Sequence, residues 1–445
     1  MTTPQHCVAV IGGATAGAEV AGRLAELGCI VVVFEQNPRP YGKIEDGLPS
    51  WHIALRKKEY ETIGGKLTRP GVHYVPSTKI GRDLDLADIA KSWGFSAVVL
   101  ANGAWRDRPI PIEGAQAFVG HGLVYQNPFV ISFNHQNDPG FQGQRFDYPD
   151  GCIVVGGGLA SIDVAKILML ENVKRVLGER GIDTSIHELE VKGIPKILAG
   201  HDLRYEDLGL AGCTLFYRRR IQDMPLMAIP EGADAARIEK VCNARERMLA
   251  KASDKYRFDV EPLSAPDGLI VETDRLVGLR FRRTKIKDGR VLATEETFEH
   301  RGTWVVSSIG SIPDPIEGIP MKGELFDFAD WDVGRIEGYP TLFSVGNVVT
   351  GKGNIVASRK HARQVSQDAI EAFLGLAQGV RSAETDMGNA ATDAARTTAD
   401  QVAAQLAAAP DATTLAEILR RVEERQKQLG YSDYASWIAS IGVPA

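Results

Sequence analysis

Two glycine-rich turns, each preceded by a short apolar run and followed by a helical pattern, constrain this sequence more than any other feature. They occupy residues 12–17 (Gly-Gly-Ala-Thr-Ala-Gly) and 156–161 (Gly-Gly-Gly-Leu-Ala-Ser). A short glycine motif arises easily by chance, but a strand, a glycine turn and a helix in succession bind the pyrophosphate of a dinucleotide. Two such units in 445 residues predict two domains that bind two dinucleotides.

The first turn continues in the way a ribose-binding unit requires. Residues 7–11 predict a buried parallel strand, and residues 16–27 predict a helix that ends at Gly28. A second apolar run closes with Glu35, and an acidic residue about 20 positions past such a turn hydrogen-bonds an adenosine ribose. Ala14 departs from the pattern, because glycine there lets the phosphates approach the backbone most closely. The alternative is a unit of this fold that binds nothing.

The second turn differs in ways that indicate a different ligand. An apolar run at residues 152–155 leads into it, and residues 161–170 predict the helix that follows. The next strand, at residues 214–217, ends in three consecutive arginines rather than in an acid. Guanidinium groups bind phosphate in a bidentate manner, so this strand end suits the 2′-phosphate of NADPH; a solvated basic strand end is the alternative. We therefore expect FAD at the first turn and NADPH at the second.

Composition and charge exclude several classes of protein. Apolar residues make up 44% and charged residues 24%, which is ordinary for a globular protein, and the formal net charge of −6 argues against a general nucleic-acid binder. The N-terminus has no signal-peptide pattern, and no apolar run is long enough to span a bilayer. We expect a cytoplasmic protein with no nucleic acid and no membrane among its partners.

The five cysteines lie far apart in the sequence and form no Cys-x-x-Cys pair. Without such a pair neither an iron–sulfur cluster nor a zinc site has ligands at usable spacing, so we expect no metal. No cysteine pair follows Glu35, where flavin disulfide reductases place their redox-active dithiol. We expect buried structural thiols. Electrons must then leave the flavin for an acceptor outside this chain.

Later segments indicate that the first domain is interrupted by the second. The apolar runs at residues 95–104 and 304–310 are each followed by prolines, a pattern typical of points where a chain passes between domains. A third run at residues 341–347 predicts a return to the first sheet, followed by a helix over residues 358–374. The predicted fold is α/β, with two Rossmann-like dinucleotide-binding domains and a C-terminal helical extension. The predicted boundaries are 1–108 and 335–378 for the FAD-binding domain, 109–334 for the NADP-binding domain and 379–445 for the linker and extension.

Four segments carry a family resemblance. Residues 38–44 and 47–52 (Pro-Arg-Pro-Tyr-Gly-Lys-Ile and Gly-Leu-Pro-Ser-Trp-His) resemble the adrenodoxin reductase family of FAD-containing ferredoxin–NADP reductases. Residues 218–231 look like the NADPH-binding half of a relative, the glutamate synthase small subunit, and residues 346–356 resemble the loop that lies under the flavin ring. The resemblance covers residues 5–375 and implies FAD, NADPH and a ferredoxin-like acceptor.

Further positions depart from the family pattern. Residues 43–46 put two acids where the family has an arginine or a tyrosine near the flavin. Asn347 stands where related flavoproteins carry an aspartate that accepts a hydrogen bond from the ribityl chain, and an amide oxygen still accepts one. We expect Asn347 to adjust the flavin environment rather than to abolish binding.

Motifs and resemblance together select the candidate binding residues. For FAD they are Gly12, Ala14, Ala16, Gly17, Glu35, Gly42, Ala101, Gly103, Gly346, Asn347, Gly353 and Ile355. For NADPH they are Gly156, Gly158, Leu159, Ala160, Arg218 and Arg219. Free N–H groups and a positive dipole end at the two helix starts favour the pyrophosphates.

Two further side chains are candidates for catalytic roles by resemblance. His52 belongs to the family-like segment and is expected near the isoalloxazine, where it holds water or protons; a structural histidine is the alternative. Glu231 is expected to orient the nicotinamide carboxamide or to pair with His52; stabilising the dipole of a following helix is the alternative. Hydride transfer itself needs no protein base.

A basic run on a predicted hairpin is the candidate docking surface for an acidic acceptor. Its members are Arg280, Arg282, Arg283, Lys285, Lys287 and Arg290. Positive charge near the nicotinamide domain steers an acidic ferredoxin. The alternative is a charged edge strand that prevents aggregation.

The tail after residue 379 differs from the rest of the chain. Residues 381–412 are rich in Ala, Thr and Asp and predict a polar linker with helical stretches. Apolar residues then recur at helical spacing from Leu415 to Leu429, and a second short apolar face follows at residues 434–441. This segment docks on the parent protein, forms a homodimer or binds a partner; docking is the default.

Three functions fit these observations. The first is an FAD-dependent NADPH oxidoreductase that delivers single electrons to a ferredoxin-like iron–sulfur acceptor. The second is an electron-input subunit related to the glutamate synthase small chain, although the cluster-binding extension of that subunit is not expected before a first strand that starts at Cys7. The third is a catalytically silent flavin-binding scaffold, which the arginines after the second turn disfavour.

Overall fold

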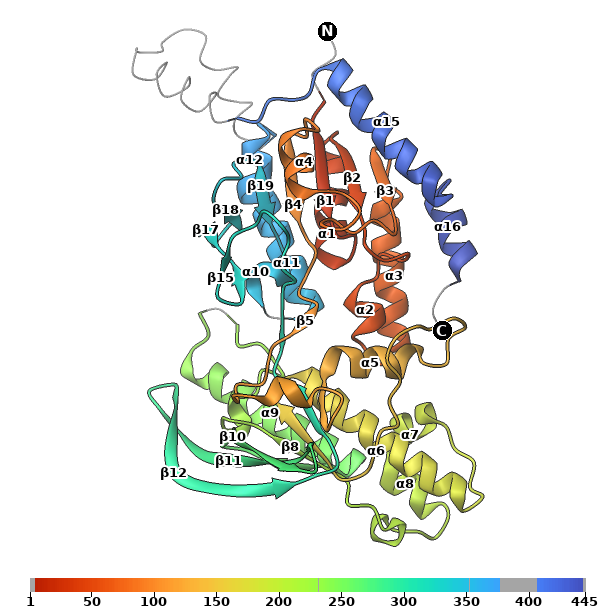
Figure 1. The fold of residues 1–445 in the computed structure, drawn as a ribbon, viewed down its shortest axis with the longest axis vertical. Helices are drawn as coiled ribbons and strands as arrows, with labels where there is room; N and C mark the ends of the chain where they lie inside the picture. The colour runs from red at the N-terminus through yellow and green to blue at the C-terminus, as the bar shows by residue number, and fades with distance from the viewer. Residues whose placement is uncertain (1–4, 231, 352, 377–405, 443–445) are drawn as a thin grey trace. The chain divides into compact units, whose positions relative to one another are not determined.

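The chain forms two compact units, each built around a parallel sheet (Figure 1). The computed structural model describes residues 5–230, 232–351, 353–376 and 406–442. The first unit is drawn from residues 1–45, 53–106 and 311–445, and the second from residues 46–52 and 107–310.

The sheet of the first unit has five parallel strands in the order β19-β4-β1-β2-β3. Its strands are β1 (Cys7–Ile11), β2 (Ile30–Phe34), β3 (Val72–Val75), β4 (Ala97–Leu100) and β19 (Leu342–Ser344). Every residue of β1, β2, β4 and β19 is buried, because helices or loops cover both faces of the sheet. The strands predicted at residues 7–11 and 30–34 are confirmed.

Buried ion pairs join the helices beside this sheet. The helices are α1 (Thr15–Glu26), α3 (Ile53–Leu67) and α11 (Ile355–Val365), which continues through a π-helical turn (Ser366–Ile370) into α12 (Glu371–Phe373). The buried Glu19 carboxylate of α1 accepts hydrogen bonds from Lys66 of α3 and Arg363 of α11. Arg23 forms a second pair with Glu371. These pairs hold the three helices together at the edge where the first glycine turn begins.

The other face of the sheet carries a second apolar layer. It shares one buried core with alternate strand residues such as Ala9 and Val32. The elements of this layer are α4 (Leu86–Lys91), the hairpin β15 (Met321–Lys322) and β16 (Leu325–Phe326), the hairpin β17 (Phe328–Asp330) and β18 (Arg335–Ile336), and α15 of the C-terminal region. Two short helices complete the unit, α2 (Lys43–Asp46) and α10 (Asn347–Thr350).

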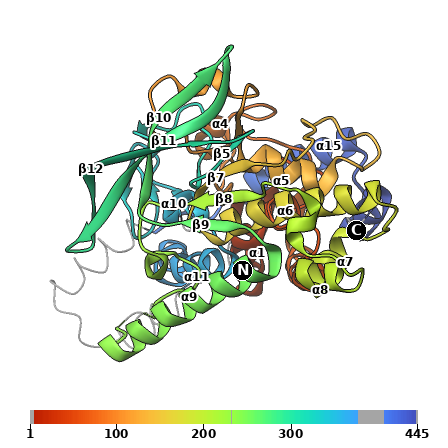
Figure 2. The same ribbon diagram turned by 90° about the horizontal axis from the view of Figure 1, so that it is seen from below.

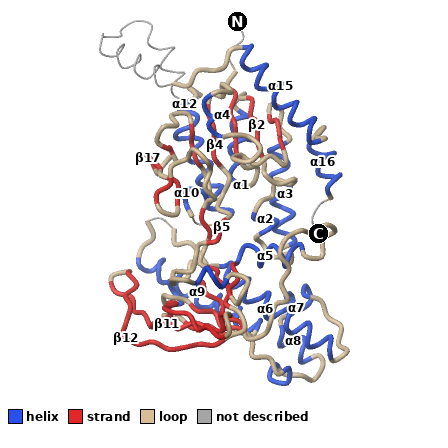
Figure 3. The backbone as a smooth tube through the Cα atoms, viewed as in Figure 1, coloured by secondary structure: helices blue, strands red, loops and turns tan. Residues whose placement is uncertain are grey.

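The second unit is also built around a five-stranded parallel sheet, in the order β6-β13-β7-β8-β9. Its four other strands repeat the arrangement of β4, β1, β2 and β3, but its edge strand β6 comes first in the sequence, whereas β19 comes last. Figure 3 shows the strands of both units in red and their helices in blue. The strands are β6 (Leu123–Tyr125), β7 (Cys152–Gly156), β8 (Cys213–Phe216), β9 (Asp259–Glu261) and β13 (Val305–Ser308). The strand that carries the glycine turn is central in both sheets, so each turn lies where neighbouring strands also end.

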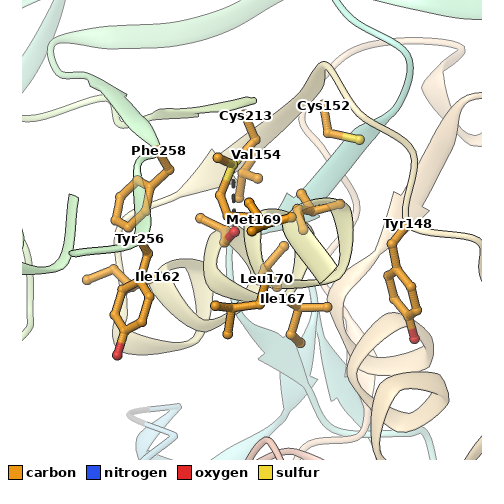
Figure 4. Close-up of a cluster of buried hydrophobic side chains, with 14 of the residues drawn as sticks. Tyr148, Cys152, Val154, Ile162, Ile167, Met169, Leu170, Cys213, Tyr256 and Phe258 are labelled. Carbon is orange, nitrogen blue, oxygen red and sulfur yellow. Dashed lines mark hydrogen bonds between the residues drawn. The ribbon is translucent and has the colours of Figure 1, made fainter. Parts of the chain in front are cut away.

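Helices cover one face of the second sheet. They are α5 (Gln126–His135), α6 (Leu159–Glu179), α7 (Ile186–Lys192), α8 (Ile194–Ala199) and α9 (Ala235–Tyr256). Figure 4 shows the buried side of α6, where Ile167 and Leu170 lie among side chains from β7, β8 and the end of α9. Helix α6 is longer than the predicted 161–170, because buried apolar residues continue to Leu177.

An antiparallel sheet covers the other face, and Figure 2 shows its long hairpin. Its strands are β10 (Ser264–Glu272), β11 (Arg275–Lys287) and β12 (Arg290–Arg301). Phe281 of β11 stacks on Phe216 of β8 with ring centroids 4.0 Å apart, which fixes this sheet against the parallel one. The basic run predicted on a hairpin therefore lies on β11 and its turn.

The chain passes between the two units at several points along the sequence. The boundaries fall at β5 (Arg106–Asp107) and at β14 (Ser311–Ile312), close to the prolines that predicted such crossings. In addition, residues 46–52 belong to the second unit. The Asn134 side chain of α5 donates to the Leu48 carbonyl at 2.9 Å, and His135 lies 3.1 Å from the Asp46 carboxylate.

Two C-terminal helices dock on the first unit, as predicted. They are α15 (Ala412–Leu429) and α16 (Tyr434–Ile441), and they run beside β3 and α3 in Figure 1. Side chains of Asp411 and Asp433 cap their N-termini, and α15 buries Ile418 and Val422 completely. Most of the predicted linker, residues 381–412, lies outside the described residues. Among described helices, none combines the length and the apolar character that crossing a bilayer requires.

The predicted α/β architecture, with an interrupted first unit and a C-terminal helical extension, is confirmed. Short 3-10 turns at Ala115–Phe118, Tyr205–Leu208 and Ile221–Asp223 are further regular elements of the described residues. The last of these lies in the loop that follows β8.

Candidate functional site

The first glycine turn has no room for a side chain at two positions. Gly12 has a φ of +101°, and a Cβ there would lie 2.6 Å from the Ala101 carbonyl oxygen. A Cβ on Gly17 would lie 1.8 Å from the Gly12 carbonyl oxygen. The start of α1 therefore packs closely against the turn that follows β1, and the first N–H groups of α1 have no partner within the helix.

A cleft opens at this edge of the first sheet and contains several predicted residues. Its space is about 640 Å³, including the part open to solvent. The lining residues are Ile11, Gly12, Ala14, Phe34, Glu35, Gln36, Gly42, Thr78, Lys79, Ile80, Ala101, Asn102, Trp105, Asp314, Pro315 and Ile316. Gly12, Ala14, Glu35, Gly42 and Ala101 are thus brought together as predicted from the sequence.

Glu35 is buried beside the first turn. One carboxylate oxygen accepts a hydrogen bond from the Gly13 N–H at 2.7 Å, and the other accepts from the Asn37 N–H at 2.9 Å. Only 4% of the residue is exposed. These bonds fix the carboxylate at the end of β2, within the lining of the cleft.

A glycine, Gly42, lies opposite the Ala14 methyl group. Gly42 has a φ of +50°, and a Cβ on it would lie 3.0 Å from the Ala14 Cβ. Both residues line the cleft. An alanine at position 14 therefore narrows the cleft at a point where the facing segment carries no side chain.

The late segment predicted near the flavin meets the start of α1. Gly346 has a φ of +78°, a Cβ on it would lie 2.7 Å from the Ala16 Cβ, and its N–H donates to His361 Nδ1 at 3.0 Å. The Asn347 side-chain oxygen accepts from the Gly353 N–H at 2.7 Å, which closes the loop before Ile355, the first residue of α11. Gly103 follows β4 with a φ of +70°.

The second glycine turn is tight on one side and open on the other. A Cβ on Gly156 would lie 2.5 Å from the Ser308 carbonyl oxygen, and a Cβ on Gly157 would enter the Tyr217 ring. Nothing lies within 4 Å of the Cβ position of Gly158, which caps α6. Leu159 and Ala160 form the first turn of α6, and half of Leu159 is exposed. The open side of the turn leaves room for a phosphate group at the helix start.

The three arginines after β8 are not equivalent. Arg220 forms two hydrogen bonds with the Asp223 carboxylate, at 2.9 and 3.0 Å. Arg219 donates to the Gly289 carbonyl at 3.1 Å and lies 3.8 Å from Asp223. Arg218 is exposed, and its guanidinium forms no ion pair with a residue in the described part of the chain. Arg218 is therefore the arginine most available to a ligand.

Arg245 of α9 supports this arginine loop, a role that sequence reasoning missed. Its buried guanidinium donates to the Gln222 carbonyl at 2.9 Å and to the Met227 carbonyl at 2.5 and 3.0 Å. These hydrogen bonds stabilise the loop over residues 218–227. No sequence signal distinguishes Arg245 from the other basic residues of α9.

The candidate catalytic side chains are only partly described. His52 Nε2 is shielded from solvent, has no hydrogen-bond partner among described atoms and lies 3.7 Å from an Asp163 carboxylate oxygen. Asp163 was not selected from the sequence, because it lies 111 positions away on α6. Glu231 lies outside the described residues, so its predicted pairing with His52 stays a prediction.

Acids neutralise part of the basic run on β11. Arg280 and Arg282 both pair with Asp267, and Arg283 pairs with Glu261. Lys285 and Lys287 lie further along β11 and are exposed. The charge available to a partner is therefore concentrated at the end of the hairpin.

All five cysteines are free and lie within the described residues, and four of them are buried. Burial raises the pKa of the Cys7, Cys29 and Cys152 thiols to about 12. Burial also raises the pKa of Cys213 well above its usual value, and Cys242 is half-buried. The four buried thiols stay protonated near neutral pH, which confirms the prediction of structural cysteines for them.

Two parallel sheets, each with a glycine turn at the end of its central strand, define an oxidoreductase architecture that binds two dinucleotides. Residues 8–188 match the family model described as pyridine nucleotide-disulphide oxidoreductase.

Similarity to individual proteins points to particular oxidoreductases within this class. The chain is 25% identical over 393 residues to the NADPH-ferredoxin reductase FprA of Mycobacterium tuberculosis, which covers 81% of this chain and 80% of that protein. It is 30% identical over 172 residues to the small chain of glutamate synthase (NADPH) of Bacillus subtilis, covering 38% of this chain and 34% of that one. The solved structure of Mycobacterium tuberculosis FprA in complex with NADPH shares the fold, with a TM-score of 0.62 over 90% of each chain at 21% identity. The chain is thus a homologue of both proteins, and the resemblance drawn from its motifs is confirmed.

Proposed function

We propose that this chain is an FAD-dependent NADPH oxidoreductase that passes electrons to a ferredoxin-like iron–sulfur acceptor. The contrast between the two glycine turns carries the proposal: the buried carboxylate of Glu35 stands at the first, and the exposed guanidinium of Arg218 follows the second. A carboxylate suits the hydroxyls of an adenosine ribose, whereas a guanidinium suits a 2′-phosphate. Homology to an NADPH-ferredoxin reductase supports the same assignment.

The residues of the first cleft fit FAD. The positions of Gly12 and Gly17 leave no space for a side chain, so the backbone can approach a pyrophosphate at the start of α1. Glu35 would bind the ribose, and the segments around Ala101 and Asn347 would line the path of the rest of the group. FAD bound there would supply the chemistry of accepting one hydride, which carries two electrons, and releasing those electrons singly.

The protein's own residues would bind NADPH, orient its nicotinamide and hold protons. In this proposal the start of α6, from Gly158 to Ala160, binds the NADPH pyrophosphate, and Arg218 and Arg219 bind its 2′-phosphate. His52 would hold water or a proton near the flavin, and an Asp163 carboxylate oxygen lies 3.7 Å from its Nε2. Glu231 stays our candidate for orienting the nicotinamide carboxamide.

An anaerobic titration with NADPH tests this function. The purified protein should be yellow, and its visible flavin absorbance should bleach as NADPH is added, because the flavin is reduced. The measurement is an absorbance spectrum after each addition. If FAD is bound but does not bleach, the enzyme proposal is wrong and the silent flavin-binding scaffold takes its place.

The identity with the glutamate synthase small chain favours a second candidate, an electron-input subunit of a larger complex. The two candidates differ in what the isolated chain can do. Rapid reduction of an added ferredoxin by the isolated chain supports the first, whereas a requirement for a co-purifying subunit supports the second. The cytoplasmic location and a homodimer through the C-terminal helices stay predictions from the sequence.

Lys285 and Lys287 are our proposed docking residues for the acceptor. They lie at the end of β11, pair across the hairpin with Leu292 and Arg290, and are exposed. The arginines earlier in the strand already pair with acids, so they add less to the long-range field. Small ferredoxin-like acceptors are acidic, and exposed positive charge accelerates their encounter at low salt.

Replacing Lys285 and Lys287 together by glutamate is expected to lower the rate constant for reduction of an acidic ferredoxin about tenfold at low ionic strength. The rate with a small artificial acceptor such as ferricyanide should not change, since that acceptor needs no docking surface. Stopped-flow reduction at several salt concentrations measures both. The matched control changes Lys192 and Lys196 of α7 and α8 to glutamate, which alters the net charge equally; an equal loss there would refute the assigned surface.

A further inference from the structure

The C-terminal helices contact two segments that line the first cleft. Residues 76–80 contribute Thr78, Lys79 and Ile80 to the lining, and residues 38–45 contribute Gly42. Residues 76–80 and 38–42 are loops, which are the parts of a fold most easily displaced, and α2 begins at Lys43. What holds these loops in place therefore affects whether the cleft keeps its shape.

Helix α15 holds the wall that contains Thr78. The Arg425 guanidinium donates to the Thr78 hydroxyl at 3.0 Å and to the Ser77 carbonyl at 3.4 Å. Gln426, the next residue, donates to the Tyr74 carbonyl at 2.8 Å. Ser77 has a φ of +48°, a left-handed conformation that costs free energy for a residue other than glycine. Such a turn persists because its surroundings fix it, and Arg425 is one of the groups that do so.

Helix α16 holds the wall that contains Gly42. The Trp437 indole donates to the Pro38 carbonyl at 2.8 Å. From the other side, the Arg39 guanidinium donates to the carbonyls of Ile441 and Gly442, both at 3.2 Å, and also pairs with Glu45. The helix end and the 38–45 segment are thus joined in both directions.

We propose that α15 and α16 act as a brace that keeps the two walls of the first cleft at the spacing FAD needs, so that the C-terminal extension sets how tightly FAD is retained. The proposal rests on the assignment of FAD to the first cleft. None of the contacting side chains belongs to the glycine turn, to β1 or to the predicted catalytic residues. The extension thus acts on cofactor retention through the loops, and Arg425 and Trp437 are positioning residues.

The test compares two arginines of the same helix. Arg425→Met removes the contacts with Thr78 and Ser77. Arg420→Met is a matched control because, among the described residues, Arg420 pairs only with Glu417 and Glu424 of α15 itself. The full-length holoprotein is diluted and the fluorescence of released FAD is followed. FAD should dissociate about tenfold faster from the Arg425 variant than from wild type, as expected for one lost hydrogen-bonding cation, and at the wild-type rate from the control.

A second variant and a second readout separate the brace from general damage. Trp437→Phe keeps an aromatic ring but removes the indole N–H donor to Pro38, and it should also speed FAD loss, so the proposal stays testable if the Arg425 variant fails to fold. Binding of 2′,5′-ADP should be unchanged in both variants, because it reports on the second unit. Equal FAD retention in Arg425→Met, Trp437→Phe and the control would overturn the brace but leave the proposed function intact. A wild-type protein that binds no FAD would instead refute the proposed function.

Discussion

Replacing Gly17 by alanine is expected to give protein that retains almost no FAD and unfolds at markedly lower denaturant concentration. The added Cβ would lie 1.8 Å from the Gly12 carbonyl oxygen and 3.2 Å from a Val10 methyl group. Gly12 is held in place, because its N–H donates to the Phe34 carbonyl at 2.8 Å. The start of α1 must therefore shift off the sheet, which costs about 3 kcal/mol or more, as overpacking at a rigid contact does.

The measurement is the ratio of flavin absorbance to protein after desalting, together with a urea unfolding curve. Gly178→Ala is the control, since Gly178 lies in α6 and nothing lies within 4 Å of its Cβ position. That change should keep FAD and stabilise the protein by about 0.5–1 kcal/mol, because alanine is the better helix former. If Gly17→Ala keeps its full complement of FAD and its stability, the contact between the first turn and α1 is not as described.

The glycine turns could be predicted from sequence because their signals are local. A run of apolar residues, a glycine-rich turn and a helical pattern lie within about 30 consecutive residues in each unit, as a βαβ unit requires. The same holds for Glu35, whose distance from the turn reflects one helix and one strand. Its hydrogen bond with the Gly13 N–H shows why the acid and the turn belong together. These features therefore predict both the fold class and the first cleft.

Other features could not be predicted because they depend on contacts between distant residues. Asp163 and His52 meet through the packing of residues 46–52 on the second unit, and nothing near either residue indicates the pair. Arg245 reaches its carbonyl partners through the orientation of α9, which the sequence does not encode in a short pattern. Helix packing and loop course decide such contacts, so they become visible only in three dimensions.

The roles of the three arginines at residues 218–220 could be predicted from the sequence only in part. Arg218, Arg219 and Arg220 look alike in the sequence, yet Arg220 has an acid three positions later, Asp223, which pairs with it. The nearby acid is a local signal that Arg220 is less available to a ligand than the other two arginines. The distinction between Arg218 and Arg219 depends on the Gly289 carbonyl, 70 positions away, and was not available.

Replacing Arg218 by alanine is expected to raise the KM for NADPH about 10- to 100-fold while changing the KM for NADH less than about threefold. A guanidinium that forms charge-assisted hydrogen bonds to a phosphate contributes about 1.5–3 kcal/mol, and NADH has no 2′-phosphate to lose them. Arg218 is exposed after β8 and has no ion pair with a described residue, so removing it breaks no internal contact of that kind.

Arg220→Ala is the matched control because the same residue type is removed two positions away. Its guanidinium is engaged by Asp223, and an exposed ion pair of this kind contributes only about 0–1 kcal/mol. Steady-state rates with each nucleotide and calorimetric binding of 2′,5′-ADP and 5′-AMP measure the difference. An equal rise of KM for NADPH and NADH in Arg218→Ala would mean that this residue does not read the 2′-phosphate. A larger effect of Arg220→Ala than of Arg218→Ala would mean that the ligand displaces Asp223 from its internal pair.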